Sequence, residues 1–556
     1  MTSAKQDADP ASVAAAKLGM TLPDLGLPPA RNEFRIDDDV RVPTRDGESL
    51  LGEHYVPETD TPRGTLLVRS SYGRGFPYGP LLAEPYAERG YHVLMQSVRG
   101  THGSTGRFEP MIHEAADAHD TLVWLREQDW FDGRLGTLGA SYLGFVQYGL
   151  MMDAPEELKA SVVMMAPHDF GKAAYDQGIF ALETFLAWSD STAAQAGGLT
   201  MPEMGARIAT AGQRLGPAMT SLPMADAAEE ALGGMAPWYR EWILHPDLGD
   251  NFWAGFDFSA ALGRTRAAVL LTGGWRDIFL GQMMEQYAAL HDRGLDVAMT
   301  IGDWEHSAPL SVAAAPIHQQ ALAWFDEHLA GTAPRTRKEA VSIELVGAGT
   351  WLDLPAWPPA TVGHVWYPTG EGKLHDAPTG AAAKVQFVYD PADPTPAVGG
   401  ALLTGGGRVD NGVVEGRADV VTFTSEALGT DLDVVGVVEV ELGVAVDNSF
   451  ADAFVRLCDV DQQGRSVNMT DAIHRLDPAV PAGETQRVAL GLAPCAYRIP
   501  AGHRVRLQVS GGAHPRFARN LGVAGAQCTS TDMRPSVHTI ILDDSRITIP
   551  VLTQRP

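Results

Sequence analysis

The stretch Gly139-Ala140-Ser141-Tyr142-Leu143-Gly144 places a serine between small residues at the junction of two differently patterned segments. The preceding residues 135–138 are mostly apolar, and residues 145–152 have the character of a helix. A serine at such a strand-to-helix junction is the signature of a nucleophile elbow, a strained turn that exposes the hydroxyl at the top of a sheet. The backbone N–H of Tyr142 would then point to where an oxyanion forms. An ordinary Gly/Ser-rich loop has the same local pattern. The rest of the chain must therefore show whether Ser141 is a nucleophile.

Strand-like and helix-like segments alternate on both sides of this stretch. Alternation of this kind predicts a parallel sheet covered by helices on both faces, which is an α/β fold. A hairpin is predicted ahead of it, at residues 40–57. The strand-like runs lie at residues 65–69, 91–97, 160–165, 267–272 and 296–301, and the helix-like runs at 82–89, 114–128, 280–292 and 316–329.

Two changes of pattern divide the chain into domains. Residues 167–253 have helical periodicity, many Ala and Met residues and no strand-like run, which predicts a helical cap inserted into the α/β domain. From residue 340, short alternating runs separated by Gly, Asp and Pro predict an antiparallel jelly-roll β-sandwich, beginning with the run at 341–345. The predicted domains are an N-terminal extension (1–33, with a short helix at 11–20), an α/β-hydrolase domain (34–166 and 254–335), the helical cap (167–253) and the jelly roll (340–556).

Composition excludes several classes of partner. The 556 residues carry a net charge of −27 and give a pI of about 4.9. Such a charge repels phosphate backbones and anionic membrane surfaces, so we expect neither nucleic acid nor membrane as a partner. No dinucleotide fingerprint or P-loop occurs, and residues 459–464 resemble a calcium loop that lacks its distal glutamate, which favours a hairpin turn. No cofactor and no metal are therefore expected.

The cysteines and the N-terminus bear on localisation. Cys458, Cys495 and Cys528 form an odd set without zinc-site spacing, so we expect small buried side chains rather than a disulfide framework. Residues 1–27 lack a basic segment followed by an apolar one, and no apolar span is long enough for a membrane helix. These features predict a cytoplasmic protein.

A serine nucleophile needs a base and a carboxylate that orients the base. In α/β-hydrolases these follow the serine in the order acid, then histidine, on loops after later strands. Asp277 comes just after the strand-like run at 267–272, and His306 just after the run at 296–301. Alone, each would pass for an ordinary loop residue, but together they lie in the required order at the edge where Ser141 lies. Asp303 and Glu305 are rival acids that lie too close to His306 in sequence.

Aromatic residues complete the predicted site. Tyr72 follows an early strand, where its hydroxyl could serve as a second oxyanion donor, with packing as the alternative role. Phe185 and Trp188 of the cap, together with Phe279, are predicted to line a substrate pocket, although helix packing is the commoner role of such side chains.

Motifs along most of the chain resemble those of the cocaine-esterase-like (CocE/NonD) hydrolases, which are related to X-prolyl dipeptidyl aminopeptidases and α-amino-acid ester hydrolases. The segments that carry the resemblance are residues 42–47, 69–74, 98–100, 104–108, 132–133, 139–144, 274–277, 302–306, 504–510 and 515–520. The resemblance implies a hydrolase domain, a helical cap and a jelly roll. It also implies Ser141 as nucleophile, His306 as base and Asp277 as its orienter, with the Tyr72 hydroxyl and the Tyr142 N–H as the oxyanion hole.

The sequence departs from the family pattern near the site. Ser71 stands where proline is common, Arg276 where an aromatic residue is frequent, and Asp303 and Glu305 where Pro and Ser are frequent. These departures bear on substrate preference. No acidic cluster for an α-amino group is evident, which disfavours amino-acid esters and dipeptides as substrates.

The resulting hypothesis is a serine hydrolase that cleaves a small-molecule carboxylic ester, or an amide, through an acyl-enzyme on Ser141. An acyltransferase with the same triad would pass the acyl group to an alcohol or amine, and the sequence does not separate the two. A non-catalytic protein whose jelly roll binds carbohydrate is a third hypothesis, which an intact triad disfavours. The sequence is compatible with a monomer or a homo-oligomer.

Overall fold

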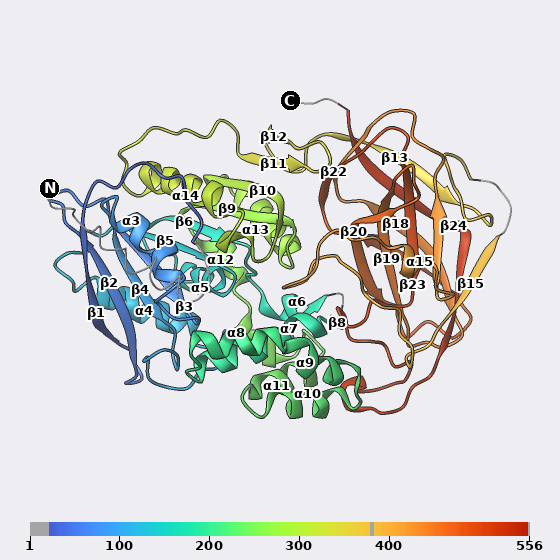
Figure 1. The fold of residues 1–556 in the computed structure, drawn as a ribbon, viewed down its shortest axis with the longest axis horizontal. Helices are drawn as coiled ribbons and strands as arrows, with labels where there is room; N and C mark the ends of the chain where they lie inside the picture. Colours follow the sequence, from blue (N-terminus) through green and yellow to red (C-terminus); the bar gives the residue numbers. More distant parts are fainter. Residues whose placement is uncertain (1–21, 177, 379–382, 554–556) are drawn as a thin grey trace, which may run out of the picture.

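The structure, a computed structural model, describes residues 22–176, 178–378 and 383–553. The helix predicted at 11–20 lies outside these residues. Figure 1 shows a sheet covered by helices, a helical segment beside it and a C-terminal domain of antiparallel strands. The α/β-hydrolase fold with a C-terminal antiparallel β domain is thereby confirmed.

The first domain is built on a ten-stranded sheet in the order β1-β2-β4-β3-β5-β6-β9-β10-β11-β12. The strands from β4 to β11 in this order run parallel to one another. At the two edges, β1, β2 and β12 are added in antiparallel pairing. The central strands are almost wholly buried, as expected for a parallel sheet covered on both faces. The strands up to β10 are β1 (Phe34–Pro43), β2 (Ser49–Pro57), β3 (Thr65–Ser70), β4 (His92–Ser97), β5 (Leu135–Ala140), β6 (Leu158–Met164), β9 (Ala268–Arg276) and β10 (Val297–Glu305).

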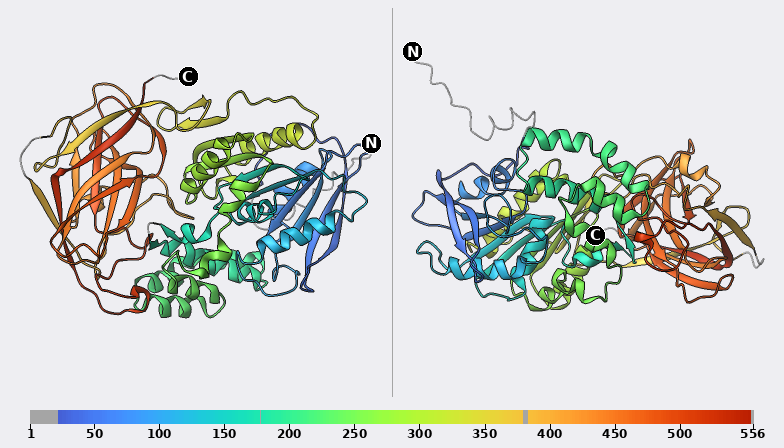
Figure 2. Two further views of the ribbon diagram at one scale, coloured as in Figure 1. Left: turned by 180° about the vertical axis from the view of Figure 1, so that it is seen from behind. Right: turned by 90° about the horizontal axis from the view of Figure 1, so that it is seen from below.

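Helices cover both faces of this sheet (Figures 1 and 2). All ten residues of α5 (Tyr142–Met151) are buried, which explains why the helix that follows the serine carries no charged residue. The other helices of this domain are α2 (Tyr78–Leu82), α3 (Glu84–Ala87), α4 (Glu114–Leu125), α12 (Ser259–Arg264), α13 (Leu280–Asp292) and α14 (Ala314–His328), with a short η2 (Ala308–Leu310).

The segment between β6 and α12 forms a mainly helical cap. Asp190 of α7 ties the cap together, because its carboxylate pairs with Arg207 of α8 and Arg214 of α9 at 2.5 and 2.7 Å. A two-residue ladder of β7 (Tyr175–Asp176) and β8 (Ile179–Phe180) was not expected from the sequence, since strands this short show no periodicity. The helices are α6 (Phe170–Ala174), α7 (Leu182–Ala196), α8 (Met201–Ala209), α9 (Ala211–Thr220), α10 (Met224–Leu232), α11 (Pro237–Leu244) and η1 (Asn251–Phe256).

Two antiparallel sheets that share one apolar core form the C-terminal domain. A four-stranded sheet has the order β16-β23-β19-β20, and the longest strand, β24 (Ser536–Leu552), organises the other. The strands are β13 (Thr361–Pro368), β14 (Leu374–His375), β15 (Lys384–Tyr389), β16 (Val420–Thr424), β17 (Leu432–Gly436), β18 (Glu439–Val446), β19 (Asp452–Val460), β20 (Ser466–Arg475), β21 (Thr485–Gly491), β22 (Cys495–Ile499), β23 (Arg504–Ser510) and β24, with α15 (Gly412–Glu415) and η3 (Gln527–Thr529) between them.

One run belongs to a different sheet than the sequence predicted. The sequence pattern places residues 341–345 in the C-terminal sandwich, and this prediction is wrong. They form β11 (Val341–Leu345), which lies parallel to β10, and β12 (Thr350–Leu354) completes that edge. The alternating burial of β11 is typical of a sheet edge, and this pattern does not specify which sheet the strand joins.

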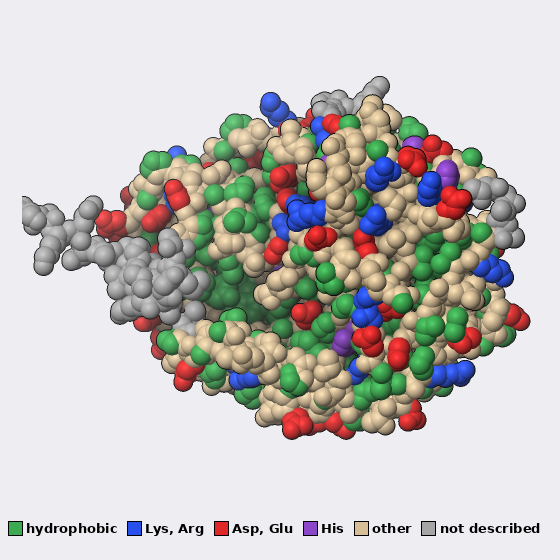
Figure 3. All heavy atoms as spheres, turned by 45° about the vertical axis from the view of Figure 1, so that its right-hand side comes forward, with side chains coloured by type: hydrophobic (Ala, Val, Ile, Leu, Met, Phe, Trp, Pro, Cys, Tyr) green, Lys and Arg blue, Asp and Glu red, His purple; other side chains and the backbone are tan. Residues whose placement is uncertain are grey.

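Further predictions concern the cysteines, one loop, membrane-spanning helices and the surface charge. All three cysteines are buried and free, and burial raises the pKa of Cys458 and Cys495 to about 12. The segment 459–464 includes the end of β19 and most of the turn to β20, which confirms the predicted hairpin turn. In the described part of the chain, no helix combines the length and apolarity needed to cross a bilayer. On the face drawn in Figure 3, acidic and basic side chains are interspersed over the C-terminal domain.

Candidate active site

Ser141 occupies a strained turn between β5 and α5. Its φ of 57° and ψ of −121° lie in a region that a residue with a side chain rarely adopts. The glycines around it allow the close approach of strand and helix. A Cβ on Gly139 would lie 2.5 Å from the Leu143 Cβ, and one on Gly144 would lie 2.3 Å from the Ala166 Cβ. The small residues of the motif are therefore required by packing.

Loops after two neighbouring strands bring an acid and a histidine to this serine. His306 Nε2 lies 2.9 Å from Ser141 Oγ, and His306 Nδ1 lies 2.6 Å from Asp277 Oδ1. The side chain of Asp277 is 0% exposed, and its other oxygen accepts a hydrogen bond from the Phe279 N–H at 3.1 Å. The three residues therefore form one hydrogen-bonded chain, in which Asp277 can hold the imidazole in the tautomer whose Nε2 faces the hydroxyl.

The two rival acids, Asp303 and Glu305, form ion pairs with arginine side chains. Arg276 pairs with Asp303 at 3.0 Å and with Glu305 at 2.5 Å, and Arg408 from the C-terminal domain also pairs with Asp303. Three of the residues that depart from the family pattern thus compensate one another's charge. They join the acid and histidine loops to each other and to the C-terminal domain, a role that sequence reasoning missed.

Tyr72 lies where its hydroxyl can donate to a developing oxyanion. Trp188 Nε1 of the cap donates to the Tyr72 hydroxyl oxygen at 3.0 Å, so that oxygen is already an acceptor and its proton is available to another group. Burial raises the pKa of Tyr72, while hydrogen bonding with Trp188 and Ser141 opposes that rise. The phenol is therefore protonated at neutral pH and is a hydrogen-bond donor beside the serine.

Tyr142 is the first residue of α5, where a backbone N–H has no acceptor within its own helix. Its side chain fixes this end of the helix. The hydroxyl donates to Glu114 at 2.6 Å and accepts from the Met111 N–H at 3.0 Å, while the ring stacks on Trp188 with centroids 6.2 Å apart. Trp188 thus contacts both tyrosines of the predicted oxyanion hole.

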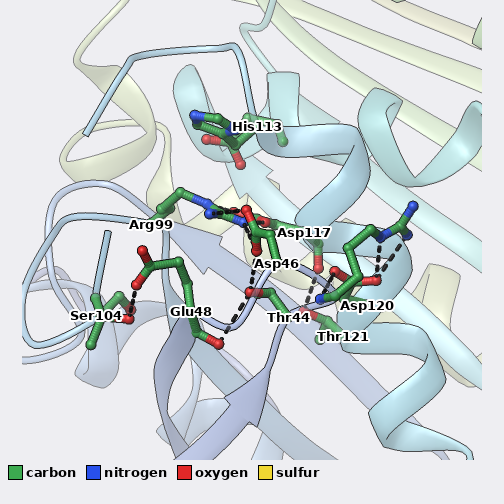
Figure 4. Close-up of polar contacts among 12 residues, drawn as sticks. Thr44, Asp46, Glu48, Arg99, Ser104, His113, Asp117, Asp120 and Thr121 are labelled. Carbon is green, nitrogen blue, oxygen red and sulfur yellow. Dashed lines mark hydrogen bonds and ion pairs between the residues drawn. The ribbon is translucent and has the colours of Figure 1, made fainter. Parts of the chain in front are cut away.

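Glu114 itself belongs to a network of buried ion pairs. Arg69 pairs with Glu114 at 2.9 Å, and Arg99 pairs with Asp117, one helical turn further along α4, at 2.6 Å. Arg99 also reaches Asp46 in the β1–β2 turn, as Figure 4 shows, and the Arg99 guanidinium lowers the pKa of that carboxyl. The motifs at residues 42–47 and 98–100, which carry Asp46 and Arg99, are therefore structural supports on the side of α4 that carries Glu114.

A pocket lined mainly by apolar side chains opens beside Ser141 and His306. Phe185, Trp188 and Phe279, which the sequence predicted for a substrate pocket, all line it. Leu403 reaches it from the C-terminal domain, and sequence reasoning had no signal for that contact because the loop around Leu403 has no distinctive pattern. The complete lining is Met111, Ser141, Tyr142, Phe145, Pro167, Phe170, Thr184, Phe185, Trp188, Ile278, Phe279, His306 and Leu403.

One group of potential metal ligands occurs among the described residues. Asp296, Glu327 and His328 bring their ligand atoms within 4.8 Å of one another. Arg335 already pairs with both carboxylates, at 2.9 Å in the case of Glu327. A guanidinium therefore occupies the position that a cation would take, and this group supports no metal site.

The fold and this site define a serine hydrolase built on the α/β-hydrolase fold. Residues 46–308 match the family model of the X-Pro dipeptidyl-peptidase (S15 family), and residues 334–547 match that of the X-Pro dipeptidyl-peptidase C-terminal non-catalytic domain. Cocaine esterase of Rhodococcus sp. (strain MB1 Bresler) is 30% identical, and the alignment covers 93% of this chain and 99% of that protein. The chain belongs to the cocaine-esterase-like (CocE/NonD) family of hydrolases, which confirms the resemblance drawn from the motifs.

Solved structures share the whole architecture. An α-amino acid ester hydrolase superposes with a TM-score of 0.79 at 22% identity and covers 95% of this chain and 99% of its own. A CocE/NonD family hydrolase from Staphylococcus aureus superposes with a TM-score of 0.68 at 18% identity, with coverage of 96% and 99%. At these identities the likeness establishes the fold alone.

Proposed function

We propose that the protein is a serine esterase that acts on small carboxylic esters through an acyl-enzyme on Ser141. The observation that carries the proposal is the hydrogen-bonded chain from Ser141 Oγ through both nitrogens of His306 to the buried carboxylate of Asp277. This arrangement provides a nucleophile, a base and an orienter in one line.

In the first half-reaction, His306 Nε2 takes the proton of Ser141 while Oγ attacks the ester carbonyl. The negative charge that develops on the carbonyl oxygen is stabilised by the Tyr72 hydroxyl and the Tyr142 N–H. His306 then gives its proton to the departing alkoxide, and the alcohol leaves. In the second half-reaction, His306 deprotonates a water that attacks the acyl-enzyme, then returns this proton to Ser141 Oγ as the carboxylic acid is released.

The cavity favours an uncharged, apolar acyl group. Aromatic and aliphatic side chains form most of its lining, and no carboxylate occurs among the described residues that line it. An α-amino group would therefore find no counter-ion there, which disfavours amino-acid esters. An aromatic or aliphatic acyl group matches this lining, since aromatic walls contribute large contact areas.

A panel of p-nitrophenyl esters with acetyl, hexanoyl, benzoyl and glycyl acyl groups tests the proposal. We expect the hexanoyl and benzoyl esters to be the better substrates and the glycyl ester the poorest. Each reaction is repeated with an added alcohol or amine. If the acyl group is recovered mainly on the added nucleophile rather than on water, the protein is an acyltransferase and the esterase proposal is wrong.

Replacing Tyr72 by phenylalanine is expected to lower kcat by about 10²-fold, because the oxyanion loses one donor while the ring is kept. The matched control is Tyr78→Phe, since the Tyr78 ring stacks on Tyr72 at 5.8 Å. This control should keep kcat within about threefold, as no charge-assisted hydrogen bond is removed. An unchanged kcat in Tyr72→Phe would reduce Tyr72 to a packing residue.

Trp188→Phe is expected to lower kcat by about fivefold, the effect of one neutral hydrogen bond of about 1 kcal/mol that orients the Tyr72 hydroxyl. A double-mutant cycle provides the readout that distinguishes this role from simple packing. Because Trp188 acts through the Tyr72 hydroxyl, the double variant Trp188→Phe/Tyr72→Phe should have nearly the kcat of Tyr72→Phe alone. Fully additive effects would show that the indole N–H does not act through Tyr72.

A further inference from the structure

The structure contains a second cavity where the helical cap meets the C-terminal domain. No described residue that lines it also lines the catalytic cavity. In Figures 1 and 2 the segment after β23 runs to the cap, where η3 contacts α10.

One wall of this second cavity is apolar. Its side chains come from β8, from the helices α7, α9, α10 and α11, and from the turn between α9 and α10. Two of these side chains are methionines, which adapt their shape to irregular apolar ligands. The residues of this wall are Phe180, Leu182, Met219, Leu222, Met224 and Ile243.

The lining also includes a guanidinium without a carboxylate partner among the described residues. Arg519 donates to the backbone oxygen of Pro391 at 3.2 Å and to that of Thr220, and no carboxylate among the described side chains pairs with it. The neighbouring Arg475, by contrast, is neutralised by Asp452 at 3.0 Å. A half-buried charge that is balanced only by carbonyl dipoles favours the binding of an anion. Burial also lowers the pKa of Arg519, as expected for an uncompensated cation.

A buried histidine also lines this cavity. His514 is only 7% exposed, and neither ring nitrogen makes a hydrogen bond of ordinary geometry within the described residues. Burial and the charge of Arg519 lower its pKa to about 4, against a small opposing effect of the Phe517 backbone, so the ring is neutral at pH 7 and keeps one N–H donor. Buried polar groups in proteins are rarely left without a partner. Arg519 and His514 together therefore offer unused donors beside an apolar wall.

We propose that this second cavity is a binding site for a carboxylate that carries an apolar chain or ring. The carboxylate would accept hydrogen bonds from Arg519 and His514, and the apolar part would lie against the wall formed by the cap. A bidentate carboxylate suits the planar guanidinium, and the apolar wall distinguishes such a ligand from a simple inorganic anion. The site is separate from the catalytic cavity, so the proposal does not depend on the chemistry at Ser141.

Calorimetric titration of the full chain with octanoate tests the proposal, with octanamide and inorganic phosphate as matched probes. We expect saturable binding of octanoate to the wild type and equally to Ser141→Ala. Octanamide should bind at least about 10-fold more weakly because it lacks the charge, and phosphate should show no measurable binding. Failure of octanoate to bind, or phosphate binding as tightly as octanoate, would overturn the proposal.

Two variants, one at a charged and one at an apolar lining residue, assign the binding to this cavity. Arg519→Gln should weaken octanoate binding by about 10- to 100-fold, the effect of losing a hydrogen bond to a charged group. Met224→Trp should abolish it by filling the apolar side. Both should keep ester turnover within about twofold, since neither residue lies in the catalytic cavity. Octanoate binding that is unchanged in both folded variants would contradict the assignment. Should Arg519→Gln lower Tm because the contacts to Thr220 and Pro391 are lost, Met224→Trp decides alone.

Discussion

Replacing Ser141 by alanine is expected to lower kcat/KM for a p-nitrophenyl ester by about 10³-fold or more. Alanine removes the only oxygen that His306 Nε2 contacts in the triad, at 2.9 Å, so no nucleophile is left to form the acyl-enzyme. The residual rate would come from binding and from the oxyanion donors, which the substitution leaves in place.

The matched control for this change is Ser307→Ala. Ser307 is exposed and immediately follows His306, so this variant removes a neighbouring hydroxyl without touching the triad. Its kcat/KM should stay within about twofold of the wild type, as is usual for surface substitutions. Retained turnover in Ser141→Ala, measured on protein free of wild type and with an unchanged Tm, would refute the proposed mechanism.

Asp277→Asn is expected to lower kcat by about 10³- to 10⁴-fold with a small change in KM. Asparagine is nearly isosteric, but its amide can present an N–H to His306 Nδ1, which favours the tautomer with the wrong nitrogen protonated. The imidazolium formed during attack also loses the charge of a carboxylate that lies 2.6 Å away and is fully buried.

Asp303→Asn separates this effect from a general loss of negative charge near the site. Asp303 lies three residues before His306, but its carboxylate pairs with Arg276 at 3.0 Å rather than with the imidazole. We expect kcat to stay within about threefold and Tm to fall slightly, because the ion pairs of Asp303 with Arg276 and Arg408 are lost. If Asp303→Asn impaired kcat as strongly as Asp277→Asn, the assignment of the orienting acid would be wrong.

The sequence predicts those parts of the site that depend on the order of the serine, the acid and the histidine along the chain. A serine between small residues specifies the turn at Ser141, and the loops after later strands specify where an acid and a histidine must lie. The structure brings Ser141, Asp277 and His306 into one hydrogen-bonded chain because parallel strands end at the same edge of the sheet.

The parts that do not follow from the sequence depend on contacts between distant segments. The hydrogen bond from Trp188 to Tyr72 joins the cap to an early loop, and no local pattern encodes it. The pairing of Arg408 with Asp303 joins two domains in the same way. The alternating run that forms β11 fits the edge of either sheet, and only its packing beside β10 decides between them.

The most direct test of the central claim is the intact mass of the protein after reaction with a fluorophosphonate, followed by peptide mapping. The account predicts a single adduct on Ser141, its absence in Ser141→Ala, and a strongly slowed rate of labelling in Asp277→Asn. A wild-type protein that forms no adduct, or one whose adduct maps to a different residue, would contradict Ser141 as the nucleophile.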